Sequence, residues 1–134
     1  MTRDLHEKLG SVEFEKLFAG MQPPAIVKHG TIRKLGTAGT IKRGTLLAKS
    51  SGSGGDGKLV IFGTSAGSDE TLTADCVLTD DIDVGTTADE NVTVYVGGCF
   101  NEAALIMAAN TTLTEADRDA LRMKGILLGT VQDP

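Results

Sequence analysis

The amino-acid sequence predicts an α+β fold that is mainly β, a small β-barrel-like domain with one or two short helices and an extended N-terminal arm. Three observations lead to this prediction. The chain has 134 residues, which is enough for one domain of ordinary size. Its 17 glycines indicate many tight turns between short strands. Aromatic residues make up only 4% of the chain, so the core must be built from Val, Ile, Leu and Ala.

The N-terminal arm is predicted to cover residues 1–24. Its first part alternates charged residues with scattered apolar ones. Ser11 is a suitable N-cap for a short helix that runs to Phe18, but such a helix is too short to be stable without a surface to pack on. Two consecutive prolines end the arm because proline has no backbone N–H and restricts the residue before it. The domain is therefore predicted to cover residues 25–134.

The first half of the domain is predicted to contain short strands joined by glycine-rich turns. The segments AIVKHGTIRKL and GTIKRGTLLAKS, residues 25–35 and 39–50, are interpreted as strands. The stretch SSGSGGDG, residues 50–57, is interpreted as a flexible, hairpin-like connection. The run KLVIFG, residues 58–63, is compact and apolar, and a polar turn follows over residues 65–70.

The second half begins with two further predicted strands. TADCVLTDDIDV, residues 73–84, alternates well enough for a strand that enters an acidic bend. ENVTVYVGG, residues 90–98, is the clearest strand, because every second residue of its centre is a valine. We expect Gly97-Gly98 to let the chain turn sharply. FNEAALIMAAN, residues 100–110, has helix-favouring composition, with a short buried strand as the alternative.

The clearest helix lies near the C-terminus. Thr112-x-x-Glu115 has the pattern of a capping box and precedes TEADRDALRMKG, residues 114–125. Acidic residues lie in the first turn of this segment and basic residues in the last, as the helix dipole favours, and Gly125 is a suitable stop. ILLGTVQ, residues 126–132, is predicted to be a closing strand.

Charge is distributed unevenly along the chain. The net charge is -5, yet residues 1–50 carry nine Lys or Arg against four Asp or Glu, and residues 51–134 carry four against fourteen. A nucleic-acid-binding domain concentrates positive charge on its folded face, so we expect no nucleic-acid partner. We expect the basic front to lie against an acidic protein surface or a neighbouring copy. The candidates for such charge contacts are Lys28, Arg33, Lys34, Lys42 and Arg43.

Two patterns that resemble binding motifs are interpreted as loops. Residues 52–57 match G-x-G-x-x-G, but a phosphate-binding loop must open a helix and needs Ser or Thr where Leu59 stands. A solvent-exposed loop is preferred. The acidic residues between positions 80 and 90 lack the glycine and glutamate spacing of a dedicated calcium loop, so a solvated bend is preferred. We expect no cofactor and no metal.

Cysteine usage gives no support for a metal site. Cys76 and Cys99 form no C-x-x-C pattern, and both histidines lie far upstream. A nucleophilic Cys99 would need a histidine as base, so buried, inert thiols are preferred. The sequence shows no secretory signal pattern and no apolar run of the roughly 18 residues that a bilayer span requires. We therefore expect synthesis in a cytoplasm and no membrane partner.

The apolar residues of the arm are candidate docking anchors. A segment of this length has no room for its own core, so its large apolar side chains need a surface. That surface is either a partner or the chain's own domain, and both possibilities stay open. The candidates are Leu5, Leu9, Phe14, Leu17 and Phe18.

The order of these segments resembles that of a known family. An apolar arm ending in prolines, "GTIKRGTLLAK", a glycine-rich loop, "DCVLTDDIDV", "VTVYVGGCFNEAAL" and a closing "LRMKGILL" are together similar to the phage head decoration (capsid cement) proteins related to the lambda head protein D. The similarity covers residues 25–128. Its strongest parts are Val94 to Leu105 and Leu121 to Leu128.

This resemblance implies a function without catalysis. It implies a β-tulip-like barrel that forms homotrimers on the outer face of the expanded phage capsid and clamps neighbouring subunits of the major capsid protein. The arm would order on the capsid and add to a strand edge of the major capsid protein. The protein would be made in the host cytoplasm and reside in the virion.

Two other functions are weighed against this one. A small β-barrel that binds a ligand or carbohydrate would need a concave apolar pocket with converging polar groups, and the scarcity of aromatic residues counts against stacking on sugars. A cysteine-dependent enzyme would lose its activity in a Cys99→Ser variant.

Overall fold

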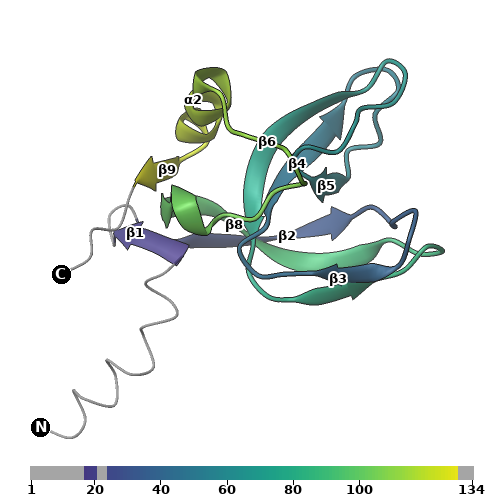
Figure 1. Cartoon of the computed structure of the whole chain (residues 1–134), viewed down its shortest axis with the longest axis horizontal. Coiled ribbons are helices and arrows are strands. Elements are labelled where there is room, and N and C mark those ends of the chain that lie inside the picture. The colour runs from purple at the N-terminus through teal and green to yellow at the C-terminus, as the bar shows by residue number, and fades with distance from the viewer. Residues whose placement is uncertain (1–16, 21–23, 130–134) are drawn as a thin grey trace, which may run out of the picture.

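The computed structural model describes residues 17–20 and 24–129 (Figure 1). Nine strands, one 3₁₀ turn and one α-helix occur in these residues. The strands are β1 Phe18–Gly20, β2 Ile26–Ile32, β3 Gly39–Ile41, β4 Leu46–Ser51, β5 Leu59–Ile61, β6 Thr71–Leu78, β7 Ile82–Val84, β8 Glu90–Asn101 and β9 Ile126–Gly129; the 3₁₀ turn η1 is Glu102–Ala104 and the helix α2 is Glu115–Met123. No helix in the described ranges is long and apolar enough to cross a membrane.

Five strands close into a barrel. Their order is β2-β5-β4-β6-β8, and the ring is complete because β8 pairs with β2 as well as with β6. The pairing between β2 and β5 is short, since only Ile32 and Leu59 are opposite each other. β3 and β7 form a separate antiparallel ribbon. The predicted fold class, a mainly β and barrel-like small domain, is confirmed.

β8 is the longest strand and changes partners along its length. Its first part pairs with β2 and β6, and its last four residues pair with β9 in parallel, while β1 pairs with it at Phe100 and Cys99. The prediction of a sharp turn at Gly97-Gly98 is wrong, because the strand continues through both glycines. Gly98 has a φ of 138°, a conformation that favours glycine. The two glycines therefore allow a change of strand partners, not a reversal of the chain.

Both faces of the central strands are buried. One cluster takes residues from all five barrel strands, including Ile32, Leu47 and Val94, and fills the barrel. The other lies on the opposite face of the same strands, where Leu46, Val77 and Tyr95 pack with Leu121 of α2 and Ile126 of β9. Successive residues of one strand point to opposite faces, so neighbours such as Leu46 and Leu47 belong to different clusters.

The C-terminal helix is confirmed, but its cap lies two residues further on than predicted. Thr114 is the N-cap: its hydroxyl accepts from the backbone N–H of Asp117, and the Asp117 carboxylate accepts from the Thr114 backbone N–H. The predicted box at Thr112 is therefore wrong, since Asp serves in place of Glu. Gly125 follows the helix with a φ of 97°, as expected for its stop.

The segment after β8 differs from the predicted helix over residues 100–110. Phe100 and Asn101 still belong to β8, and only Glu102–Ala104 form a helical turn. The Asn101 side chain caps that turn by accepting from the Ala103 N–H. Leu105 is buried in the outer cluster and Ile106 bridges to Thr45. Tertiary pairing has thus overridden the helix propensity of this alanine-rich stretch.

Candidate functional site

Two of the predicted arm anchors lie in the domain itself. Leu17 is only 4% exposed and belongs to the outer core cluster. Phe18 begins β1, opposite Phe100 of β8, so the predicted helix does not continue to Phe18. In the isolated chain, the surface that these two residues pack on is therefore the chain's own domain. The other three predicted anchors, Leu5, Leu9 and Phe14, lie outside the described residues.

An aromatic cluster holds β1 in place. The Phe18 ring stacks on Phe100 with a centroid distance of 5.0 Å and meets the Tyr95 ring edge-on at 5.2 Å. Phe100 is fully buried. Such aromatic pairs contribute roughly 0.5–1.5 kcal/mol each beyond the area that they bury. β1 is therefore held to the sheet by backbone pairing and by three packed rings.

The predicted basic contacts divide into two groups. Lys28, Lys34 and Lys42 are exposed. The Arg43 guanidinium lies 6.0 Å from the centre of the Tyr95 ring and 3.5 Å from its hydroxyl. Arg33 is held by carboxylates of the domain, as described below. The three exposed lysines therefore keep the geometry that a charge contact with a partner needs, whereas the two arginines have internal roles.

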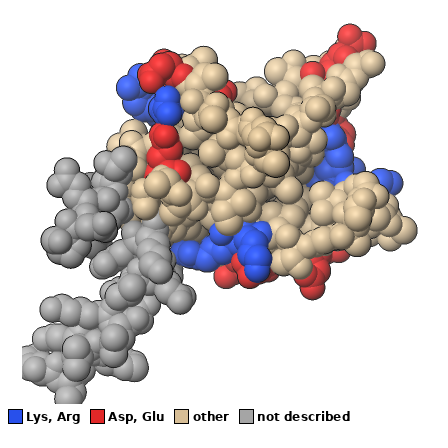
Figure 2. All heavy atoms as spheres, viewed as in Figure 1, with Lys and Arg blue, Asp and Glu red and all other residues tan. Residues whose placement is uncertain are grey.

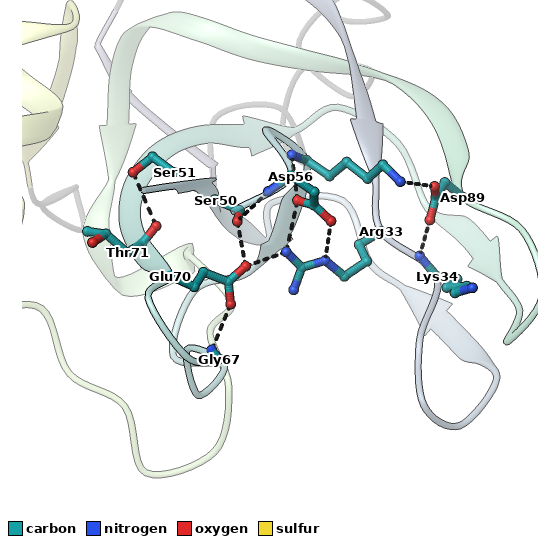
Figure 3. Close-up of polar contacts among 10 residues, drawn as sticks. Arg33, Lys34, Ser50, Ser51, Asp56, Gly67, Glu70, Thr71 and Asp89 are labelled. Carbon is teal, nitrogen blue, oxygen red and sulfur yellow. Dashed lines mark hydrogen bonds and ion pairs between the residues drawn. The ribbon is translucent and has the colours of Figure 1, made fainter. Parts of the chain in front are cut away.

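Arg33 lies at the centre of a polar network at the end of β2 (Figure 3). Its guanidinium donates two hydrogen bonds of 2.9 Å to the Asp56 carboxylate and a further one to Glu70. The Glu70 carboxylate also accepts from the Ser50 hydroxyl and from the backbone N–H of Gly67 at 2.8 Å. This network ties β2 to the loop after β4 and to the turn before β6.

The network shifts the titration of its acidic members. The Gly67 N–H, the Ser50 hydroxyl and Arg33 together lower the pKa of Glu70 to about 2. The Arg33 guanidinium holds the pKa of Asp56 well below its usual range. Beside it, Lys58 binds Asp89, whose carboxylate also accepts from the Lys34 backbone N–H at 2.8 Å (Figure 3). These carboxylates are therefore charged and paired at neutral pH.

Both signs of charge are mixed on the surface. Figure 2 shows Lys and Arg next to Asp and Glu over the helix and along the lower side of the domain, with a wide uncharged area between them. Arg33, from the basic front of the sequence, pairs with Asp56 and Glu70 from the acidic body. Part of the charge asymmetry is therefore neutralised within the fold.

The glycine-rich loop is packed against a neighbouring turn, so the prediction of a flexible, solvent-exposed loop is only partly right. It does connect the antiparallel strands β4 and β5, and most of its residues are exposed. A Cβ on Gly54 would lie 2.0 Å from the Ser68 carbonyl oxygen, and one on Gly55 would lie 2.4 Å from that of Ser51. The glycines thus permit close backbone contact, and a strand follows the loop where a phosphate site needs a helix.

The acidic bend serves the fold. Asp81 accepts from the Arg43 backbone N–H at 2.7 Å, and Asp83 accepts from the Thr40 hydroxyl at 2.6 Å within the β3–β7 ribbon. Within residues 17–20 and 24–129 no three His, Cys, Asp or Glu side chains are grouped to hold a metal ion. These carboxylates therefore have structural partners.

The two cysteines lie in different surroundings. Cys76 is buried in the barrel, and burial raises the pKa of its thiol. Cys99 is half-buried between β1 and β9. His29 pairs with Thr93, six positions along β8 from Cys99. The described part of the chain thus holds no cysteine–histidine pair with the reach of a catalytic dyad.

Comparison with known protein families identifies the group to which this fold belongs. The family model described as bacteriophage lambda head decoration protein D matches residues 17–127. The chain belongs to this family. The match begins at Leu17, the first described residue, and includes all nine strands except the last two residues of β9. No curated protein matches the chain significantly.

Membership assigns this head decoration protein to the phage capsid. The predicted family, the structural role on the capsid and the location on the virion surface are therefore confirmed at that level. The sequence did not predict that Phe18 pairs with β8. The available signal was the pair of adjacent apolar residues Leu17 and Phe18 immediately before Ala19-Gly20, which suits a short strand as well as a helix end.

Proposed function

We propose that this head decoration protein binds the outer surface of an expanded phage capsid as a homotrimer and clamps neighbouring subunits of the major capsid protein. The observation that supports this most directly is the match to the head decoration family over nearly the whole described domain. The stabilisation comes from binding, because the domain offers a packed barrel and paired surface charges. Within the described residues no cysteine is paired with a histidine that could serve as its base.

The N-terminal segment is the proposed tether. Sixteen residues precede Leu17, and a chain of this length spans at most about 55 Å when extended. Leu5, Leu9 and Phe14 are the proposed anchors on the major capsid protein. Leu17 and Phe18 are better suited to fixing the root of the tether, because both pack in the domain's own core. Tension on the tether is then carried by the sheet.

Three tethers on one trimer strengthen the attachment. Each arm supplies a few apolar contacts, which alone give weak binding. Linking several weak contacts raises overall affinity by roughly 10² to 10⁴ when all can engage at once. Lys28, Lys34 and Lys42 are the proposed additional charge contacts, since their side chains are exposed.

Removal of the tether tests this proposal. The deletion should cover residues 1–16 and spare Leu17, so that the core stays intact. We expect the shortened protein to remain a trimer in solution, as measured by light scattering. It should no longer co-sediment with expanded capsids. A full-length variant with Leu5, Leu9 and Phe14 changed to Ser is the matched control for chain length and should behave like the deletion. Full occupancy of capsids by the shortened protein would contradict the tether.

The alternative of a ligand- or carbohydrate-binding barrel has less support. Side chains from all five barrel strands fill the interior of the described barrel, which leaves a small molecule to bind on the outside. A tight ligand raises the melting temperature by mass action. A thermal-shift screen with sugars and small metabolites therefore tests this function, and a large, saturable shift would favour it.

A further inference from the structure

Among the described residues, no strand lies beside the outer edge of β2 between Val27 and Thr31. β8 pairs with β2 along one edge over the whole of Ile26–Ile32. On the other edge β5 reaches only Ile32, through its pairing with Leu59 and the hydrogen bond from the Arg33 N–H to the Leu59 carbonyl oxygen. The barrel is thus closed at one end of β2 and open along the rest of it.

The register shows which backbone groups point to this open edge. The Thr93 carbonyl oxygen accepts from the Thr79 N–H, so the backbone groups of Thr93 point toward β6. His29 lies directly opposite Thr93 and therefore points its own N–H and C=O away from β8. Because backbone direction alternates along a strand, Val27 and Thr31 do the same. The Arg33 N–H, two residues after Thr31, points to β5 and thus to the same edge, as this alternation requires.

These residues offer a ready acceptor for another strand. Val27 and His29 present their N–H and C=O groups, and Thr31 presents its N–H, without a bond from any described residue across this edge. The Thr31 carbonyl oxygen is already used, because the parallel pairing of Ile32 with Leu59 places it on the Leu59 N–H. Ile26 and Val27 are 53% and 50% exposed, which is high for apolar residues of a strand. A hollow of about 310 Å³ lies over β2 and β8 and is lined by His29, Gly30, Thr31 and Asn91. Exposed edges are usually protected by charge or proline, and here only Lys28 does so.

We propose that an extended segment of the major capsid protein pairs with the β2 edge from Val27 to Thr31 and places an acidic side chain near Lys28. This inference rests on the proposed function. In this arrangement a strand of the capsid protein pairs with the decoration protein, in addition to the binding of the decoration protein's own N-terminal tether to the capsid. Main-chain hydrogen bonds would supply affinity, and the hollow beside His29 would seat a side chain of the added strand.

The position of the edge favours the capsid as its partner. β1 and β2 are both antiparallel to β8, so the start of β1 and the open edge of β2 belong to strands that follow one another along β8. A partner held by the tether is thereby brought to β2. Lys28 has no ion-pair partner among the described residues and suits an acidic segment. Pairing of β2 with β2 of a second copy is a twofold contact, which does not close a trimer.

Hydrogen exchange on the unmodified protein gives the first test. Exchange is measured for the free protein and for the protein on expanded capsids, with fragmentation that resolves single amides between residues 24 and 33. We expect the amides of Val27, His29 and Thr31 to exchange at least about tenfold more slowly on the capsid, because each gains a hydrogen bond. Lys28 and Gly30 point to β8 and are the internal controls. Unchanged exchange at all three amides, or protection already present in the free protein, would overturn the proposal; the latter result assigns the edge to a second copy.

A proline substitution gives the second test. Val27→Pro removes one outward N–H and leaves the bonds to β8 in place, because edge strands tolerate proline on the open side. We expect its affinity for capsids to be about tenfold or more below that of Val27→Thr, which changes the same side chain but keeps the N–H. Melting curves verify that both variants fold, and the exchange measurement decides if Val27→Pro does not.

Charge reversal tests the predicted chemistry of the added strand. Lys28→Glu should weaken capsid binding more than Lys28→Gln does, and the difference should shrink at high salt. Equal binding by both variants would remove the acidic partner from the proposal. Failure of the unmodified protein to bind capsids at all would instead refute the proposed function, so the two failures are distinguishable.

Discussion

β1 and β2 lie in succession along β8 and pair with it in the same direction, yet their surroundings are opposite. β1 is short, but Leu17 just before it and Phe18 within it pack against Phe100 and the rest of the outer core. β2 is more than twice as long, but its first four residues are exposed. Length of pairing and depth of burial are therefore separate properties, and here the short strand is the anchored one.

This contrast assigns different roles to the two strands. The anchored strand suits a root from which a tether extends, because pulling on it meets a packed core. The exposed first part of β2 suits a contact surface, because the outward backbone groups of Val27 and His29 are available and the side chains of Ile26–His29 lie outside the core. In the proposed function, the same stretch of chain would attach the tether to the domain and offer an edge to the capsid.

Truncation of side chains in the two strands is the change with the largest expected difference. Leu17→Ala should lower the free energy of unfolding by about 3 kcal/mol, because it leaves a cavity in the outer core. Val27→Ala, the matched control in β2, should lower it by less than about 0.5 kcal/mol, since the side chain is half exposed. Urea denaturation of both variants measures the difference. Equal losses would show that β1 is no better anchored than β2.

Local patterns in the sequence were sufficient for the elements that depend on local rules. The alternation in ENVTVYV predicted β8, and the acidic first turn and Gly125 predicted α2. β1 could not be predicted in this way, because its partner Phe100 lies at the other end of the sequence. The prediction of a turn at Gly97-Gly98 failed for the same reason. Only the strands on either side, which are distant in the sequence, show that β8 continues there.

The candidate site was predicted less completely. Lys28, Lys34 and Lys42 were predicted to make charge contacts with a partner; their side chains are exposed, and the contacts themselves stay a prediction. Arg33 was expected to contact a partner, yet its partners Asp56 and Glu70 are brought to it by two loops. The open edge of β2 has no sequence signature, because it depends on how far β5 extends alongside it.

An effect of intermediate size is expected at Gly98, where β8 changes its pairing from β2 to β1. Gly98→Ala should lower the free energy of unfolding by about 1–3 kcal/mol, because Gly98 has a φ of 138° that other residues rarely adopt. The matched control is Gly30→Ala in β2, where the one close contact of the added Cβ is with the end of the Leu59 side chain at 2.7 Å and the φ is ordinary. We expect its loss to be smaller, as that side chain can move. A larger loss for Gly30→Ala, again from urea denaturation, would place the strain in β2.

The smallest expected effect concerns the end of β2 that is tied down by Arg33. The pKa of Glu70 is lowered from its ordinary value of 4.5 to about 2, so the folded protein favours the charged carboxylate. The resulting stabilisation is complete above about pH 4.5 and is lost as the pH falls toward 2. Glu70→Gln should therefore be less stable than the unmodified protein at pH 6, and the difference should vanish near pH 2.

Thermal melting of both proteins across this pH range measures the effect. Glu115→Gln is the matched control, because the Glu115 side chain is 88% exposed and its pairing with Arg118 is confined to the surface of α2. We expect the control to follow the unmodified protein at every pH. Hydrogen exchange should also show that protonation of Glu70 speeds exchange at the C-terminal end of β2 while leaving β1 unchanged. Parallel melting of Glu70→Gln and the unmodified protein from pH 6 to pH 2 would show that packing, and not the Arg33 network, holds that end of the strand.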